Sequence, residues 1–220
     1  MNDVALSELA QQLVVAGRKA VAAGLVLGSG GNLSARRPGA DECVVTCSGS
    51  LLDELTPEQF SVVGIADGEV RGGHPTPSSE ALLHLATYRV RPDAHALIHL
   101  HPQTSVLLDA LGVPIRLLTI DHAYYVREVR STPFLQSGTQ ELADAGAQAL
   151  ADGCNCVILG HHGCSVVADT VDLAYKRAHT LEEAARATLT MLQLGDTTTA
   201  CPPSYLEVIR AKEAAAQAGH

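Results

Sequence analysis

The chain has 220 residues, of which 46% are hydrophobic, so one domain over residues 1–220 can bury a substantial core. Its 24 acidic and 15 basic residues give a formal net charge of -9. This charge argues against a nucleic-acid partner, because affinity for nucleic acids is mainly cationic. No apolar run of about 18 residues would span a membrane, and the N-terminus has neither a basic nor an apolar leader region. We therefore expect a cytoplasmic protein without a membrane partner.

The first third of the chain predicts one helix followed by short strands. Apolar residues recur at helical spacing over 4–23, with Asp3 as the expected cap and Gly24 as the expected end. Further elements are predicted as strands at 33–36, 42–47 and 61–66, a helical turn at 54–59, and a hairpin turn at 67–68.

Two loops rich in small residues flank the first two strands, at 28–34 and 46–50. Clustered glycines allow backbone N–H groups to approach an anion closely, and Asn32 adds a side-chain donor. An ordinary turn would give the same composition in either loop, so neither loop identifies an anion site by itself.

Residues 75–80, Pro-Thr-Pro-Ser-Ser-Glu, precede a helix predicted over 81–88. Ser78 or Ser79 is expected to cap this helix, and the free N–H groups of its first turn favour a bound phosphate. Glu80 lies four residues before His84, which places both on one helical face. A capped helix with a solvated glutamate is the alternative interpretation.

The most informative segment is 95–102, His-Ala-Leu-Ile-His-Leu-His-Pro. In an extended strand its histidines share one face, and Ala96, Ile98 and Leu100 share the other. Alternate residues lie about 6.6 Å apart along a face, so the imidazoles of His99 and His101 can reach one metal ion. Pro102 cannot donate a ladder hydrogen bond and is expected to end the strand.

The second half continues to alternate between helices and strands. Helices are predicted at 104–111, 139–151 and 170–194 and from a capping box at Ser204 and Glu207 through Ala218, with strands at 115–120, 157–163 and 164–168. The strand over 157–163 ends in two histidines and a glycine, and spacing does not decide whether His161 or His162 is a third metal ligand. The chain has six cysteines and no secretory signal, and Cys154-Asn-Cys156 lacks the two-to-four-residue gap of structural zinc sites, so we predict free thiols.

Five of these motifs occur in a family-like order, namely Gly30-Gly-Asn-Leu-Ser34, Ser48-Gly49, Pro77-Ser-Ser-Glu80, His99-Leu-His101 and His162-Gly163. Together they resemble the class II aldolase/adducin family over about residues 28–194. The resemblance implies a three-layer α/β fold, with a central, mainly antiparallel sheet flanked by helices. It also implies a homotetramer with sites at the subunit contacts.

Carried over residue by residue, the resemblance implies roles for nine positions. The metal, zinc or another divalent transition metal, is held by His99, His101 and His162, the last because the family's ligand immediately precedes the glycine. The substrate phosphate is held by Asn32, Ser48, Gly49, Ser78 and Ser79. Glu80 takes the acid/base position, with a pKa that we expect burial and neighbouring groups to tune towards neutrality.

The implied activity is that of a lyase in carbohydrate metabolism. A zinc-dependent aldolase would cleave a ketose 1-phosphate, similar to L-fuculose 1-phosphate, to dihydroxyacetone phosphate and an aldehyde through a metal-stabilised enediolate. Glu80 favours an aldolase over the related 4-epimerases, which carry aspartate there. Residues 133–142 look like the fuculose-phosphate aldolase branch.

One departure from that branch leaves other reactions open. The chain has no tyrosine at 117–120, where the branch keeps a catalytic one. We expect Asp121, Tyr124 and Tyr125, together with His122, to replace it by reaching into a neighbouring subunit's site. The alternatives are a decarboxylase, dehydratase or 4-epimerase acting on a sugar phosphate or an aromatic-ring-derived acid, and a non-catalytic module like the adducin head.

Overall fold

The computed structural model describes residues 4–218 and is built around one eight-stranded sheet. The strand order is β4-β3-β2-β1-β5-β8-β7-β6, and only the pairing of β6 with β7 is parallel. The strands are β1 (Asn32–Ala35), β2 (Glu42–Thr46), β3 (Phe60–Gly64), β4 (Val70–Gly73), β5 (Ala96–Leu100), β6 (Arg130–Thr132), β7 (Cys156–Leu159) and β8 (Gly163–Ala168). The predicted mainly antiparallel sheet is therefore confirmed.

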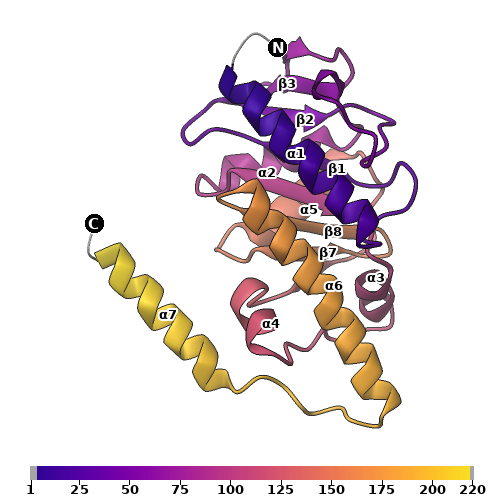
Figure 1. The fold of residues 1–220 in the computed structure, drawn as a ribbon, viewed down its shortest axis with the longest axis vertical. Coiled ribbons are helices and arrows are strands. Elements are labelled where there is room, and N and C mark those ends of the chain that lie inside the picture. Colours follow the sequence, from indigo (N-terminus) through magenta and orange to yellow (C-terminus); the bar gives the residue numbers. More distant parts are fainter. Residues whose placement is uncertain (1–3, 219–220) are drawn as a thin grey trace.

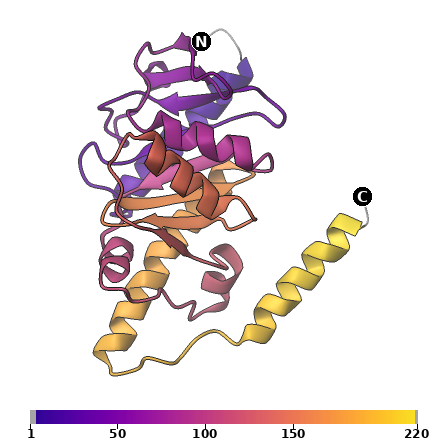
Figure 2. The same cartoon turned by 180° about the vertical axis from the view of Figure 1, so that it is seen from behind.

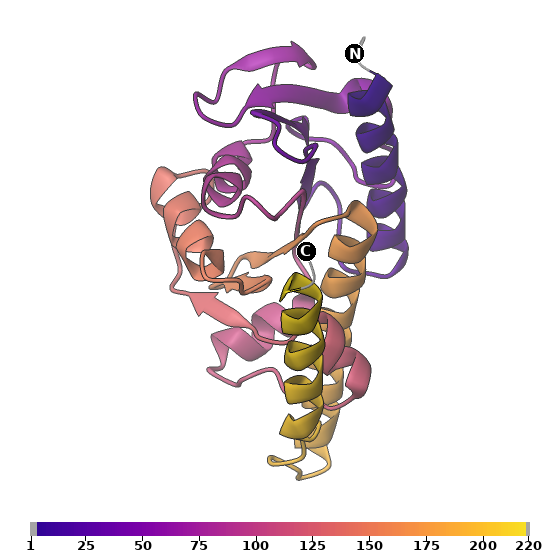
Figure 3. The same ribbon diagram turned by 90° about the vertical axis from the view of Figure 1, so that its left-hand side faces the viewer.

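Helices cover both faces of the sheet and complete the predicted three layers. Helices α1 (Val4–Ala22) and α6 (Val171–Gln193) lie on one face, while α2 (Ala81–Val90) and α5 (Gln140–Leu150) lie on the other (Figures 1 and 2). Seen from the side, the sheet separates the two helical layers (Figure 3). Each layer has its own apolar cluster against the sheet.

The alternation within β5 decides which side chains face which layer. Ala96, Ile98 and Leu100 join the cluster beneath α1 and α6, whereas Leu97 joins the cluster beneath α2 and α5. Since His99 shares the parity of Leu97, it faces the layer that contains α2. All five residues of β5 are buried, because helices cover both faces of the strand.

The remaining helices are α3 (Gln103–Ala110), α4 (Ile120–Tyr125), α7 (Pro203–Ala218) and the 3₁₀ turn η1 (Pro57–Gln59). Helix α7 stands apart from the sheet and contacts α4 (Figures 1 and 2). Among the helices formed by residues 4–218, none is both long and apolar enough to cross a membrane. All six cysteines are free thiols, as predicted.

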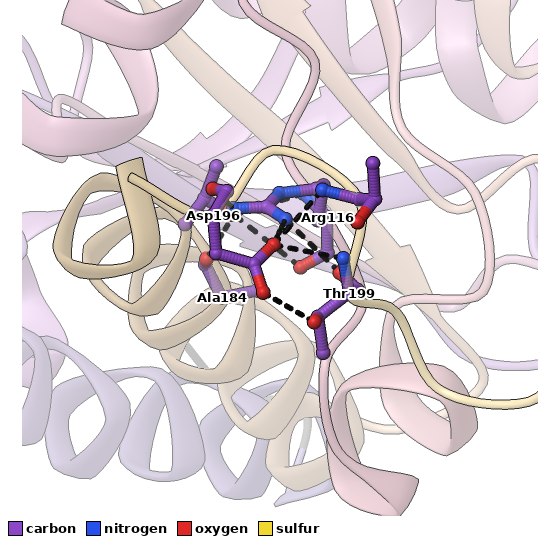
Figure 4. Close-up of polar contacts among 6 residues, drawn as sticks. Arg116, Ala184, Asp196 and Thr199 are labelled. Carbon is purple, nitrogen blue, oxygen red and sulfur yellow. Dashed lines mark hydrogen bonds and ion pairs between the residues drawn. The ribbon is translucent and has the colours of Figure 1, made fainter. Parts of the chain in front are cut away.

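The side chain of Arg116 forms hydrogen bonds with the connection from α6 to α7 (Figure 4). Its Nη1 donates to Asp196 Oδ1 at 3.0 Å and to the Thr199 carbonyl at 3.1 Å. Its backbone N–H donates to Thr188 Oγ1 at 2.9 Å, and that hydroxyl donates to the Ala184 carbonyl at 2.7 Å (Figure 4). The segment before α4 is thus held against α6 by side chains and not by a strand partner.

Several predicted boundaries are wrong for local reasons. Residues 115–120 form no strand, because their backbone bonds Thr188 and Cys201 instead of a sheet edge. Thr119 caps α4 by accepting from His122 N–H. The short strand β6 and the helix α4 were not predicted. The last helix begins at Pro203, which places Ser204 inside its first turn, and the predicted cap Asp3 lies outside the described residues.

A buried carboxylate, Glu182 of α6, fixes the start of α3. It accepts hydrogen bonds from the N–H groups of Thr104 and Ser105 at 3.1 and 2.9 Å, and from the Ser105 hydroxyl at 2.8 Å. We expect Glu182→Gln to lower the free energy of unfolding by about 3 kcal/mol, because a buried set of N–H donors loses its anion. Urea denaturation measures this, with Glu183→Gln as the matched control, since that neighbouring side chain is exposed. Equal stability of the two variants would contradict the prediction.

Candidate metal centre

Three histidines that are far apart in the sequence meet at one edge of the sheet. His99 lies in β5, His101 follows that strand, and His162 lies in the turn between β7 and β8. Their ring centroids are 4.9 to 5.0 Å apart in every pair. The antiparallel pairing of β5 with β8 brings them together, because Leu100 is opposite Cys164 in that register.

The turn between β7 and β8 separates the two adjacent histidines. His161 adopts a left-handed backbone conformation with φ 58°, its side chain is exposed, and its ring faces Phe134 with the centroids 6.4 Å apart. His162 turns inward to the other two imidazoles. Sequence spacing did not decide between His161 and His162. In the structure His162, and not His161, lies beside His99 and His101.

A carboxylate completes the cluster. Glu80, at the start of α2, places Oε2 3.2 Å from His99 Nε2 and Oε1 3.2 Å from His162 Nε2. Asn32 Nδ2 donates to Oε2 at 2.8 Å, and the Ser137 hydroxyl donates to Oε1 at 3.0 Å.

The surroundings of Glu80 favour its ionised form. Burial by itself raises the pKa of Glu80, but the electrostatic effect of His99 and His162 lowers it. The two hydrogen bonds to the carboxylate lower it further, so the pKa lies below its ordinary value. This differs from the expected pKa near neutrality, because the neighbouring donors and imidazoles lower the pKa by more than the desolvation raises it.

The four side chains fit a divalent metal ion. Each offers one nitrogen or oxygen atom, and these atoms lie within 4.8 Å of one another. His99 Nε2 and His101 Nε2 are 3.1 Å apart. Two nitrogens bound to one tetrahedral zinc at roughly 2.0–2.1 Å would be about 3.3 Å apart. Burial lowers the pKa of both His99 and His101, which keeps these imidazoles in the neutral form that binds metals.

A supporting hydrogen bond orients one of these imidazoles. His99 Nδ1 lies 3.0 Å from the hydroxyl of Ser165, on the neighbouring strand β8. A proton on Nδ1 that is donated to this oxygen leaves the Nε2 lone pair directed at the cluster. Metal-binding histidines commonly have such a partner on the second ring nitrogen.

A cavity of about 190 Å³ opens beside the cluster. All five residues predicted to hold a phosphate line it, together with Glu80, His101 and His162. The backbone N–H groups of Ser48 and Ser78 are already bonded to the Thr76 and Thr46 carbonyls. A ligand can therefore meet the Ser48 hydroxyl and the proton of the Ser78 hydroxyl, whose oxygen accepts from Glu80 N–H. No lysine or arginine is among the described residues that line this cavity.

The start of α2 differs from the prediction. The residue that precedes the helix is Glu80, not Ser78 or Ser79, and its side chain makes no cap bond. The Ser78 hydroxyl accepts from Glu80 N–H at 3.2 Å, and Ala81 N–H donates to the Ser78 carbonyl. These two N–H groups are consequently not free for an anion, because the bend that directs Glu80 at the histidines uses them.

The family pattern described as the class II aldolase and adducin N-terminal domain matches residues 11–189. The chain belongs to the class II aldolase and adducin family. The 5-deoxy-D-ribulose 1-phosphate aldolase of Bacillus thuringiensis is 32% identical over 172 residues, covering 78% of this chain and 80% of that protein. The 3-oxo-tetronate 4-phosphate decarboxylase of Haemophilus influenzae is 32% identical over 196 residues, covering 87% and 90%. A solved L-fuculose 1-phosphate aldolase, 29% identical, superposes with a TM-score of 0.84 over 93% of this chain and 95% of that one.

Within this class II aldolase family member, three predicted catalytic residues lie away from the cavity of their own chain. Asp121, Tyr124 and Tyr125 belong to α4, near α7 (Figure 1), and none of them lines the cavity. Asp121 and Tyr124 are exposed. His122 is buried and accepts from Leu118 N–H, which gives it a role in the local fold.

Sequence analysis missed Ser137 as a site residue. It lies within residues 133–142, which were compared with the aldolase branch without a role for any single residue, yet the serine hydroxyl donates to Glu80. Gly138 has φ 76°, and a Cβ there would lie 3.2 Å from the Ser79 carbonyl oxygen. A glycine that permits close approach of two loops is the signal that could have identified this contact.

The metal cluster leaves no space for a side chain at Gly163. A Cβ at this position would lie 2.5 Å from the Leu100 carbonyl oxygen, 2.6 Å from His101 Cδ2 and 3.1 Å from His99 Cε1. We expect Gly163→Ala to separate the imidazoles and lower metal affinity by at least about 10-fold. Metal titration followed by calorimetry measures this. Gly72→Ala is the control, because a Cβ there would have no atom within 4 Å and the backbone is not left-handed. Unchanged affinity in the Gly163 variant would show that the cluster tolerates the displacement.

Proposed function

We propose that this protein is a metal-dependent aldolase, with zinc as the preferred ion, that cleaves a ketose 1-phosphate to dihydroxyacetone phosphate and an aldehyde. The observation that carries the proposal is the Glu80 carboxylate beside three imidazoles, at the wall of a cavity that is also lined by the five residues predicted to hold a phosphate. The aldolase relatives support the same assignment.

His99, His101 and His162 would hold the metal. When bound, it would supply a Lewis acid for the carbonyl oxygen of the substrate. Glu80 would move the proton that the reaction requires, because cleavage takes one proton from a substrate hydroxyl and returns one to carbon. A carboxylate that accepts the first proton can donate it in the second step, so that protons balance without another acid.

The phosphate contributes binding energy away from the reacting bond. The hydroxyls of Ser48, Ser78 and Ser79 and the side chain of Asn32 line the cavity beside Glu80. A phosphate held by them would fix the distance between the reacting carbons and the carboxylate. Because the cavity wall carries no cationic side chain among its described residues, neutral donors would bind the dianion.

The deciding experiment tests two ketose 1-phosphate substrates for release of triose phosphate. The purified protein is incubated with L-fuculose 1-phosphate and 5-deoxyribulose 1-phosphate, and triose phosphate is measured with a coupled dehydrogenase. We expect turnover that a chelator abolishes and zinc restores. Absence of triose phosphate from every ketose 1-phosphate tested would reject the aldolase assignment.

A decarboxylase is the second candidate, and one comparison favours it. In sequence, the 3-oxo-tetronate 4-phosphate decarboxylase matches 196 residues of this chain, whereas the 5-deoxy-D-ribulose 1-phosphate aldolase matches 172. Loss of carbon dioxide from a 3-oxo acid needs the same stabilisation of charge beside a carbonyl, followed by protonation of carbon. Release of carbon dioxide from 3-oxo-tetronate 4-phosphate, without triose phosphate from ketoses, would establish this alternative.

We further propose that the chain forms a homotetramer in which Asp121, Tyr124 and Tyr125 act in a neighbouring subunit's site. Their position on α4, at a distance from their own cavity, is consistent with this, as is the exposure of Asp121 and Tyr124. Light scattering measures the assembly. Mixing inactive Glu80→Gln chains with inactive Tyr124→Phe,Tyr125→Phe chains should restore activity if the residues act across the interface. No recovery would place them outside the site.

A further inference from the structure

A chain of hydrogen bonds leads from Glu80 into the core on the α2 side of the sheet. Asn32 Nδ2 donates to Glu80 Oε2 at 2.8 Å, and Asn32 Oδ1 lies 2.5 Å from His84 Nε2. His84 Nδ1 lies 2.6 Å from the Ser34 hydroxyl, which lies 2.7 Å from the hydroxyl of Tyr88. His84 and Ser34 are 0% exposed and Tyr88 is 1% exposed, so water does not reach these groups.

Two elements place these five side chains in a row. Asn32 and Ser34 alternate along β1 and therefore share one face of the strand. Glu80, His84 and Tyr88 follow at intervals of four residues along α2 and share one face of the helix. The helix face packs on the strand face, and the polar groups interleave.

Elementary donor and acceptor chemistry gives this chain one direction. An ionised carboxylate only accepts, so the Asn32 amide nitrogen must face Glu80 and its oxygen must face His84. The amide oxygen also only accepts, which places the proton of the neutral imidazole on Nε2. His84 Nδ1 then accepts from Ser34, and Ser34 accepts from Tyr88.

The environment keeps His84 and Tyr88 in the protonation states that this direction requires. Burial lowers the pKa of His84 to about 4, so the imidazole remains neutral. Burial raises the pKa of Tyr88, so its hydroxyl keeps the proton that it donates. The arrangement therefore has one stable pattern of donors at neutral pH.

We propose that His84 is a positioning residue that fixes the Asn32 amide so that its nitrogen, and not its oxygen, faces Glu80 and the cavity. A rotated amide would direct its oxygen at the Glu80 carboxylate and at a bound phosphate, and both contacts would be repulsive. His84 thereby holds the proton-transferring carboxylate in register without touching the substrate. The inference rests on the proposed function of Glu80 in proton transfer.

The experiment begins with the wild-type protein and does not depend on catalysis. Selective ¹⁵N labelling of histidine, with the His84 signals identified by their loss in His84→Gln, reports which ring nitrogen carries the proton. We expect a neutral imidazole protonated at Nε2 at pH 7. A proton on Nδ1, or a charged ring, would overturn the inference even if the enzyme is an aldolase.

Substitutions then separate positioning from a merely structural role. His84→Leu removes both imidazole bonds and is expected to lower kcat by about 10²-fold, because a misdirected carboxylate is out of register with the substrate. His84→Gln retains an N–H donor for Asn32 and is expected to recover activity to within about 10-fold of wild type. Metal content should be unchanged in both variants.

Thr87→Val is the matched control on the same helix, because this buried hydroxyl bonds the Leu83 carbonyl and not the chain described above. We expect its kcat to equal that of wild type. A folded His84→Leu protein with wild-type kcat, or equal losses in the Leu and Gln variants, would overturn the inference. If His84→Leu does not fold, three measurements still test the inference. They are the kcat of His84→Gln, the kcat of Tyr88→Phe, for which we expect a smaller loss, and the tautomer of His84 in the wild-type protein. Failure of the proposed function would appear differently, as wild-type protein that cleaves no ketose phosphate.

Discussion

Replacing His101 with alanine is expected to remove the bound metal and the lyase activity together while the fold persists. A catalytic zinc site typically has three protein ligands, and His101→Ala would leave only two of the three imidazoles proposed to hold the ion. Loss of a Lewis acid that contributes several kcal/mol to transition-state stabilisation corresponds to a decrease in turnover of at least about 10³-fold. Elemental analysis gives the metal content, and circular dichroism checks the fold.

Two histidines of the same chain are matched controls for this change. His161→Ala alters the residue next to His162, but its ring faces Phe134 at the surface. His95→Ala alters a histidine of the same sequence pattern, located just before β5 and thus at the opposite end of the strand from His101. Both variants should keep metal and activity. Stoichiometric metal and full turnover in His101→Ala would show that the ligand assignment is wrong.

Replacing Glu80 with glutamine is expected to lower turnover by about 10²–10⁴-fold, which is the usual contribution of a positioned acid or base. The substitution keeps the shape and removes the proton acceptor. The glutamine oxygen can still accept from Asn32, and its amide can donate to Ser137, so the fold should be unaffected. Stopped assays of triose phosphate release measure the loss, and three imidazoles remain to bind metal.

A second substitution at the same position distinguishes charge from placement. Glu80→Asp keeps the carboxylate but shortens the side chain, so it should retain its metal and recover part of the activity lost in the glutamine variant. If Glu80→Gln turns over at the wild-type rate, Glu80 does not transfer the proton. If it loses its metal instead, Glu80 belongs among the ligands.

Much of the architecture followed from local sequence patterns. The apolar stripe of α1, the apolar positions of α6 and the alternation within β5 each predict an element that the structure contains. These features depend on residues a few positions apart, so periodicity detects them. The family resemblance predicted the three-layer arrangement with a central, mainly antiparallel sheet. The structure contains that sheet, and the family match agrees with it.

The errors occurred where distant groups compete for the backbone. Residues 115–120 have the composition of a strand, but Thr188 and Cys201 satisfy their polar groups, and a short helix follows. The serines before α2 have the composition of a cap, but the bend that directs Glu80 at the histidines uses the first N–H groups. No local pattern reveals a hydrogen-bond partner located dozens of residues away.

The sequence by itself determined the family, the element types and the kinds of side chain available for a metal and a phosphate. Only the tertiary structure decided which of them meet: the pairing of β5 with β8 brings His162 to His99, and the packing of α2 on β1 connects Glu80 through Asn32 to His84. It also separated His161 from His162 and added Ser137 to the carboxylate. The physical reason is that strand register and helix packing minimise the free energy of the whole core, whereas local sequence patterns report only the preferences of neighbouring residues.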